Sequence, residues 1–109
     1  MSTLASKKCT ACERGTPPID EKEQQDLLKQ LQDGWRIVDG HHLQRTYRFD
    51  DFKSALDFTN RVGELAEQEG HHPNIELSYG QVGITLWTHA ANGLTENDFI
   101  LAAKIDDCS

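Results

Sequence analysis

Three histidines and one glutamate in the second half of the chain have side chains that can transfer protons near neutral pH. His71 and His72 are adjacent, Glu67 shortly precedes them, and His89 follows later. Imidazole titrates at about pH 6.5, so one ring can donate a proton while another accepts one. The same three imidazoles could also bind zinc. Spacing alone leaves both a proton-transfer site and a metal site open.

A predicted helix and a predicted loop position the first three of these residues. Gly70 is expected to end a helix, which puts Glu67 in the last helical turn, at the negative end of the helix dipole. A carboxylate is unfavourable there, and a protonated histidine nearby would offset that cost; a solvated surface glutamate is the alternative. Pro73 favours an extended conformation for His72, so the two adjacent histidines can project from the loop in different directions.

His89 is expected at the end of a strand. The buried face of that strand consists of Val82, Ile84 and Leu86. Because side chains alternate along a strand, His89 falls on the opposite face and is available for chemistry. His41 and His42, which follow a predicted turn, are interpreted as surface histidines without a chemical role.

The periodicity of apolar residues predicts the elements that carry these side chains. Asp20 and Glu23 have the spacing of a capping box, which opens a first helix. The expected strands cover 35–38, 43–49, 74–79 and 81–89, with a long helix over 52–69 and a last helix from 95. The order α-β-β-α-β-β-α favours an α+β fold, a four-stranded antiparallel sheet with three helices on one face.

Composition narrows the class of protein. Eighteen acidic against eleven basic residues give a net charge of −7, which argues against direct binding of nucleic acid. No apolar run approaches the roughly 20 residues of a membrane helix, and no secretory signal is recognisable, so a cytoplasmic location is expected. The 109 residues fit a single domain.

The first 18 residues are expected to form a flexible tail, and residues 19–109 the domain. Cys9 and Cys12 lie in this tail before two prolines, and Cys108 lies near the other end. The Cys9-x-x-Cys12 spacing could supply half of a zinc site, but no second such pair exists. The simpler interpretation is a mobile tail with reactive thiols.

The second helix has a wider apolar face than one sheet contact requires. Phe58, Val62 and Leu65 broaden that face. A small domain gains stability by association, so part of this helix is expected to pack on a partner subunit. A deeply buried helix is the alternative.

The ordered set of residues from Glu67 onward resembles the pterin-4a-carbinolamine dehydratase family. The matching residues are Glu67, His71-His72-Pro73, Tyr79, His89 and Asp98, flanked by Gly34-Trp35 and Gly93-Leu94-Thr95. The segment Leu86-Trp87-Thr88-His89 is similar to the corresponding segment of bacterial members. The resemblance covers about residues 19–106, nearly the whole expected domain, and leaves the two tail cysteines outside.

The resemblance implies a reaction and a mechanism. The reaction is removal of water from a 4a-hydroxytetrahydropterin to give quinonoid dihydropterin, which recycles the cofactor of aromatic amino acid hydroxylases. No metal or organic cofactor is implied. By this resemblance His71 and His89 are the proton carriers on either side of the pterin, His72 orients it, and Glu67 supports the charged forms of the loop histidines. A homodimer or homotetramer is also implied.

Three further residues are candidates for substrate binding by the same resemblance: Trp35, Thr88 and Asp98. Asp98 also has the spacing from Thr95 that a helix cap requires, which favours a structural role. Trp35 could shape a pocket or fill the core.

Two other classes of function remain open at this stage. One is a binding module that stabilises a transcription regulator or the hydroxylase itself through the Phe58 and Val62 surface. The complete histidine set argues against a purely non-enzymatic role. The other is a zinc site of His71, His72 and His89, which metal analysis would test.

Overall fold

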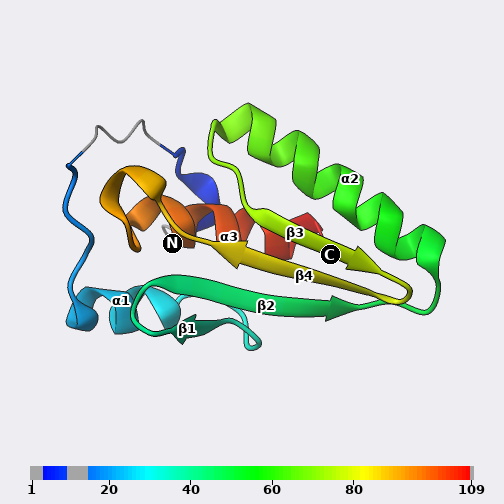
Figure 1. Ribbon diagram of the computed structural model, residues 1–109, viewed down its shortest axis with the longest axis horizontal. Helices are drawn as coiled ribbons and strands as arrows, with labels where there is room; N and C mark the ends of the chain where they lie inside the picture. The colour runs from blue at the N-terminus through cyan, green and yellow to red at the C-terminus, as the bar shows by residue number, and fades with distance from the viewer. Residues whose placement is uncertain (1–3, 10–14, 109) are drawn as a thin grey trace.

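A four-stranded antiparallel sheet forms the centre of the molecule. The structure, a computed structural model, describes residues 4–9 and 15–108. The strands lie in the order β1-β2-β4-β3 (Figure 1). Their bounds are β1 (Arg36–Val38), β2 (His42–Arg48), β3 (Asn74–Ser78) and β4 (Gln81–Leu86). The central β2–β4 ladder joins two hairpins into one sheet.

Three helices accompany this sheet, as expected. They are α1 (Glu21–Leu28), α2 (Phe52–Glu69) and α3 (Glu96–Cys108), and two short 3-10 helices are η1 (Leu4–Ser6) and η2 (His89–Ala91). Figure 1 shows α2 running beside the β3 edge and α3 passing the middle of the sheet. The order α-β-β-α-β-β-α and the α+β fold class are confirmed. In the described part of the chain, no helix is both long and apolar enough to cross a membrane.

Local capping signals fix the ends of two helices. The Asp20 side chain accepts a hydrogen bond from the Glu23 N–H at the start of α1. At the start of α2, the Asp51 side chain accepts a hydrogen bond from the Ser54 N–H in the same way. Backbone and side-chain hydrogen bonds from Ser54 lower the pKa of Asp51. Gly70 ends α2 in the left-handed conformation, with φ of 66°, so the loop to β3 starts where the sequence predicts.

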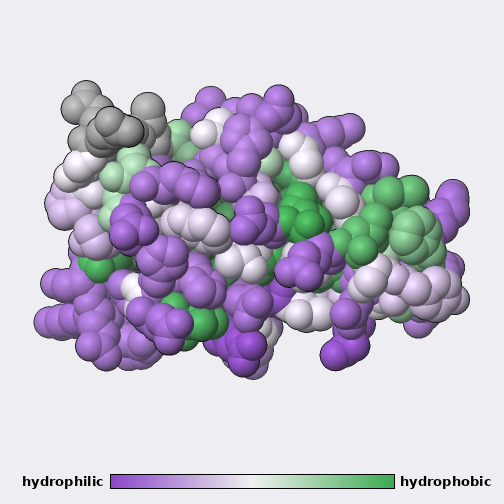
Figure 2. Space-filling model, viewed as in Figure 1, coloured by the Kyte–Doolittle hydropathy of each residue, from purple (hydrophilic) through white to green (hydrophobic). Residues whose placement is uncertain are grey.

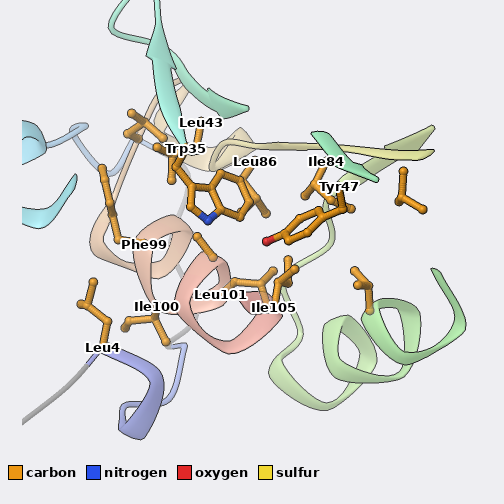
Figure 3. Packing of buried hydrophobic residues seen from close by; sticks show 14 of the residues in the cluster. Leu4, Trp35, Leu43, Tyr47, Ile84, Leu86, Phe99, Ile100, Leu101 and Ile105 are labelled. Atoms are coloured by element: carbon orange, nitrogen blue, oxygen red, sulfur yellow. The ribbon is translucent and has the colours of Figure 1, made fainter. Parts of the chain in front are cut away.

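The hydrophobic core lies between the sheet and the helices (Figure 3). Leu43 of β2, Leu86 of β4 and Phe99 of α3 are fully buried in it. Phe58 and Val62 of α2 also have no exposed surface, and the Phe58 ring packs against Tyr47 with centroids 4.7 Å apart. The expectation that these two side chains reach a partner subunit is therefore wrong, because one chain buries them completely.

A buried carboxylate joins the sheet to α3. Asp106 accepts hydrogen bonds from Trp35 Nε1 at 2.9 Å, from Arg45 Nη1 at 2.9 Å and from the Tyr47 hydroxyl. Figure 3 shows the Trp35 nitrogen and the Tyr47 oxygen facing the same space above α3. Burial raises the pKa of Tyr47 above its usual range, and the Asp106 carboxylate acts in the same direction. Tyr47 therefore stays a donor to Asp106.

This network explains why a charged residue lies on the inner face of β2. The Arg45 guanidinium also lies 4.5 Å above the Tyr47 ring, a cation–π distance. Gly34 makes room for it, since a Cβ there would lie 2.8 Å from Arg45 Nε, and its φ is +119°. The sequence alone indicates no role for Arg45. Its partner in the network, Asp106, lies 61 residues further along the chain.

Part of the segment expected to be a flexible tail packs against α3. Leu4 is only 2% exposed and belongs to the core. Lys7 forms an ion pair with Glu96 at 2.8 Å. The Cys9 N–H donates to Glu69, and its thiol lies 3.5 Å from the Asn97 carbonyl oxygen. Cys12 lies outside the described residues. The domain boundary at residues 18 and 19 stays a prediction.

Cys9 is expected to react slowly with iodoacetamide. Burial raises the pKa of its thiol to about 12, and the negative charge of Glu69 acts in the same direction. Because the thiolate is the nucleophile, labelling at pH 8 should be roughly 10³-fold slower than for an exposed cysteine, and should accelerate as pH rises. Timed labelling and peptide mapping measure this rate, with the urea-unfolded protein as control. Equal rates in the folded and unfolded protein would contradict the prediction.

Candidate active site

His71 is held directly after the end of α2. Its N–H donates to the Ala66 carbonyl, and its side chain is only 13% exposed. Its Nε2 lies 2.6 Å from Oδ1 of Asp98. A carboxylate accepts hydrogen bonds, so Nε2 carries the proton in this contact. In neutral His71, Nδ1 is then the nitrogen left with a free lone pair.

Asp98 is the fully buried centre of this part of the site. Its Oδ2 accepts from the Thr88 hydroxyl at 2.8 Å and from the Thr95 N–H at 2.9 Å. The two threonine hydroxyls are also 2.8 Å apart. Because Thr88 gives its one proton to Asp98, Thr95 donates to Thr88. Asp98 thus caps α3, as its spacing predicts, and also binds His71.

His72 and Glu67 form a second pair at the surface. His72 Nε2 contacts Glu67 Oε2, and the two side chains are 60% and 78% exposed. Such an exposed pair contributes little to folding stability, because water screens the charges. Glu67 lies in the last turn of α2, where its carboxylate is unfavourable for the helix itself. The contact with His72 supplies the offsetting partner that the sequence predicts.

His89 lies at the start of η2 rather than at the end of a strand. β4 ends at Leu86, and Thr88 is the residue that precedes η2. The His89 ring packs on Trp87, with centroids 4.7 Å apart. Its neighbour Thr88 turns the other way, toward Asp98. Consecutive residues therefore connect His89 to the carboxylate that binds His71.

Two further histidines, His41 and His42, lie beside this site. The rings of His41 and His42 lie 5.5 Å and 6.2 Å from the Trp87 ring. Their position after a turn predicts surface residues, but both are half-buried. The strand pattern contains a signal for this position. When the start of β2 is paired with the end of β4, Leu43 lies opposite Leu86, and the next opposed residues are His42 and Trp87.

Trp35 contacts a different part of α3. It is 6% exposed and donates to Asp106, eight residues along the helix from Asp98. At 1.5 Å per residue, the two carboxylates are about 12 Å apart along the axis. The structure thus brings His71, Thr88 and Asp98 together through hydrogen bonds and places Trp35 in the core. His89 follows Thr88 in the chain, and its ring packs on Trp87. Among the described residues, no three His, Cys, Asp or Glu side chains form a metal-binding group.

Comparison with known proteins identifies the family. The model of the pterin 4 alpha carbinolamine dehydratase family matches residues 17–108. The chain belongs to this family. It is a family of hydro-lyases, and the family resemblance seen in the sequence is confirmed.

Bacterial members of the pterin-4-alpha-carbinolamine dehydratase family match almost the full chain. A relative from Alkaliphilus metalliredigens, provisionally named as this dehydratase, is 50% identical over 106 residues, covering 97% of this chain and 96% of that protein. One from Rubrobacter xylanophilus with the same provisional name is 53% identical, covering 97% of this chain and 98% of that protein.

Two solved structures of dehydratase-like proteins share the fold. The transcriptional coactivator/pterin dehydratase from Brucella melitensis has a TM-score of 0.78 and 37% identity, covering 84% of this chain and 97% of that one. A pterin dehydratase-like protein identified as a RuBisCO assembly factor in the alpha-carboxysome has a TM-score of 0.59 and 28% identity. That match covers 69% of this chain and 88% of that one.

Proposed function

We propose that this protein removes water from a 4a-hydroxytetrahydropterin to give quinonoid dihydropterin. The observation that carries the proposal is the contact between His71 and the buried Asp98, in a member of the dehydratase family. Thr88, the residue before His89, donates to the same carboxylate. A carboxylate that fixes the proton on one imidazole nitrogen leaves the other nitrogen ready for proton transfer. The geometry therefore suits acid/base catalysis.

The reaction needs two proton transfers at one ring. The C4a–O bond breaks as the oxygen receives a proton and leaves as water. The N5–H bond breaks, and its electron pair forms the C4a=N5 double bond. His71 and His89 carry these protons, and hydroxide, a poor leaving group, departs only when protonated. The imidazoles supply both transfers, so the mechanism uses no metal or organic cofactor.

The remaining candidates position these groups. His72 orients the pterin from the exposed loop, and Glu67 balances the charge of a protonated His72. Thr88 and Asp98 were expected to bind substrate, but their polar atoms already bind each other and Thr95. We assign them to holding His71 in place. Trp35 acts through the core rather than at the substrate.

The test is direct measurement of dehydration. A freshly generated 4a-hydroxytetrahydropterin is mixed with the protein, and its decay is compared with the decay in buffer. The wild type should accelerate it, and His89→Ala should lose about 10²- to 10⁴-fold of that acceleration. Glu76→Ala, an exposed change on β3, is the matched control. No acceleration by the wild type would refute the proposal, and stoichiometric zinc in protein purified without added metal would refute the metal-free mechanism.

The cellular role follows from the chemistry of substrate and product. A 4a-hydroxytetrahydropterin forms when an aromatic amino acid hydroxylase uses its tetrahydropterin, so we propose that this protein serves that recycling in the cytoplasm. Adding it to a hydroxylase coupled to a dihydropterin reductase should raise the steady-state rate when dehydration is limiting. An unchanged rate under that condition would contradict the recycling role.

We also propose that the protein is a homodimer or homotetramer. In the described part of the chain, the exposed large apolar side chains are Phe52, Leu56 and Tyr79. Figure 2 shows hydrophobic surface at the end of the molecule where α2 begins and the β3–β4 turn lies. Burying this surface on a second copy would stabilise a small domain.

Light scattering after gel filtration tests the oligomer. The wild type should elute as a dimer or tetramer, and Leu56→Glu should shift it toward the monomer, because a charge in an apolar contact is costly to desolvate. Gln68→Glu adds the same charge at an exposed position near the other end of α2 and is the control. A monomeric wild type would contradict the proposal.

A further inference from the structure

Trp87 lies at the centre of a cluster of imidazole rings. Its indole contacts His89 at 4.7 Å with an angle of 37° between the ring planes. His41 lies at 5.5 Å and 42°, and His42 at 6.2 Å and 58°. The side chain is half-buried. One indole therefore contacts three imidazoles, one of which is a proposed proton carrier.

The His41–His42 pair holds this cluster in place. In the β2–β4 register Leu43 pairs with Leu86, so His42 and Trp87 are the next opposed residues and share a face of the sheet. His41 Nε2 lies 3.3 Å from Oδ1 of Asn92, the residue after η2. The Asn92 oxygen accepts, so Nε2 of His41 donates. Its Nδ1 then accepts from His42, 3.2 Å away.

His89 differs from the other two site histidines in its partner. His71 and His72 each contact a carboxylate. Within residues 4–9 and 15–108, no carboxylate forms an ion pair with His89, and its ring contact is Trp87. A proton carrier is cationic during part of each turnover. The face of an indole attracts a cation within about 6 Å of its centroid, and His89 lies inside that distance.

We propose that Trp87 is a positioning residue for His89. Its indole fixes the orientation of the imidazole and attracts the cationic form of the ring during proton transfer. His41 and His42 support the indole from the side of β2. The inference rests on the proposed dehydratase function and assigns a role to a residue outside the histidine and carboxylate set.

A double-mutant cycle tests whether Trp87 acts through His89. Trp87→Leu should lower kcat roughly fivefold with little change in KM, as expected for a lost cation–π contact. Trp87→Phe keeps an aromatic face and should retain most of the activity. In a His89→Ala background, Trp87→Leu should have no further effect. An equal loss in that background, or an equal loss for Trp87→Phe, would overturn the proposal.

A second measurement does not depend on activity. In the NMR spectrum of the wild type, the ring protons of His89 should be shifted by the ring current of the indole. Trp87→Leu should abolish this shift and leave the His71 signals unchanged. Unchanged His89 signals would overturn the positioning role. If the wild type fails to dehydrate the pterin while the shift is present, the proposed function fails and the contact between the rings remains.

Discussion

Asp98→Asn is expected to lower kcat for pterin dehydration by about 10²- to 10⁴-fold. The amide oxygen can still accept from Thr88 and Thr95, which turns the NH₂ group toward His71. An NH₂ group donates, so Nε2 of His71 must accept and its proton moves to Nδ1. The nitrogen that faces away from Asp98 then has no lone pair for the substrate.

Two measurements separate this effect from loss of the fold. Asp98→Asn keeps the helix cap, so its urea midpoint should stay close to that of the wild type. Glu96→Gln removes an exposed carboxylate in the same turn of α3 and should keep full activity. Full activity of Asp98→Asn would show that the proton position on His71 does not matter for the reaction.

Asp106→Ala is expected to destabilise the protein by about 3–5 kcal/mol. The substitution leaves the charge of Arg45 and the donors of Trp35 and Tyr47 without their shared acceptor. Breaking a buried ion pair from one side costs this much because the remaining charge stays desolvated. Urea unfolding monitored by circular dichroism measures the change in the free energy of unfolding.

The next residue provides a matched control for this prediction. Asp107 lies on the same helix turn and is exposed. Asp107→Ala should change the free energy of unfolding by no more than about 0.5 kcal/mol, the usual range for surface substitutions. Similar midpoints for the two variants would mean that the Asp106 network contributes little.

Local signals in the sequence predict most of the fold. The cap at Asp20 and the stop at Gly70 depend on residues within one helical turn, and both lie where the sequence predicts. The Arg45–Asp106 contact joins residues 61 positions apart. No local pattern specifies such a pair. From the sequence alone, Arg45 is only a charged residue that interrupts the apolar face of β2.

In the candidate site, too, the sequence predicts the local contacts but not the contacts between distant residues. The Thr95–Asp98 spacing predicts a helix cap, and the cap is present. The second use of the same carboxylate, binding His71, depends on how the loop after α2 meets the start of α3. His41 and His42 depend likewise on the pairing of β2 with β4. Sequence reasoning needs the register of the sheet before it can place them.

The apolar pattern of α2 overestimates the surface available for an interface, for a related reason. The Phe58 ring packs against the rings of Tyr47 and Phe49, with ring centroids 4.7 Å and 5.2 Å apart. A helical pattern gives the width of an apolar face but not the area that the sheet covers. Among the described residues, the exposed large apolar side chains of α2 are Phe52 and Leu56, which lie before the Phe58, Val62 and Leu65 that the sequence indicates.

The order of the strands determines which contacts can form early when the chain folds. The β1–β2 and β3–β4 hairpins each close over a short turn. The β2–β4 ladder pairs residues 43–48 with 81–86 and must wait for the intervening chain to be ordered. Closing such a long loop costs entropy before its contacts compensate. Docking of the two hairpins is therefore expected to limit the folding rate, and the histidines from the two hairpins meet only after that step.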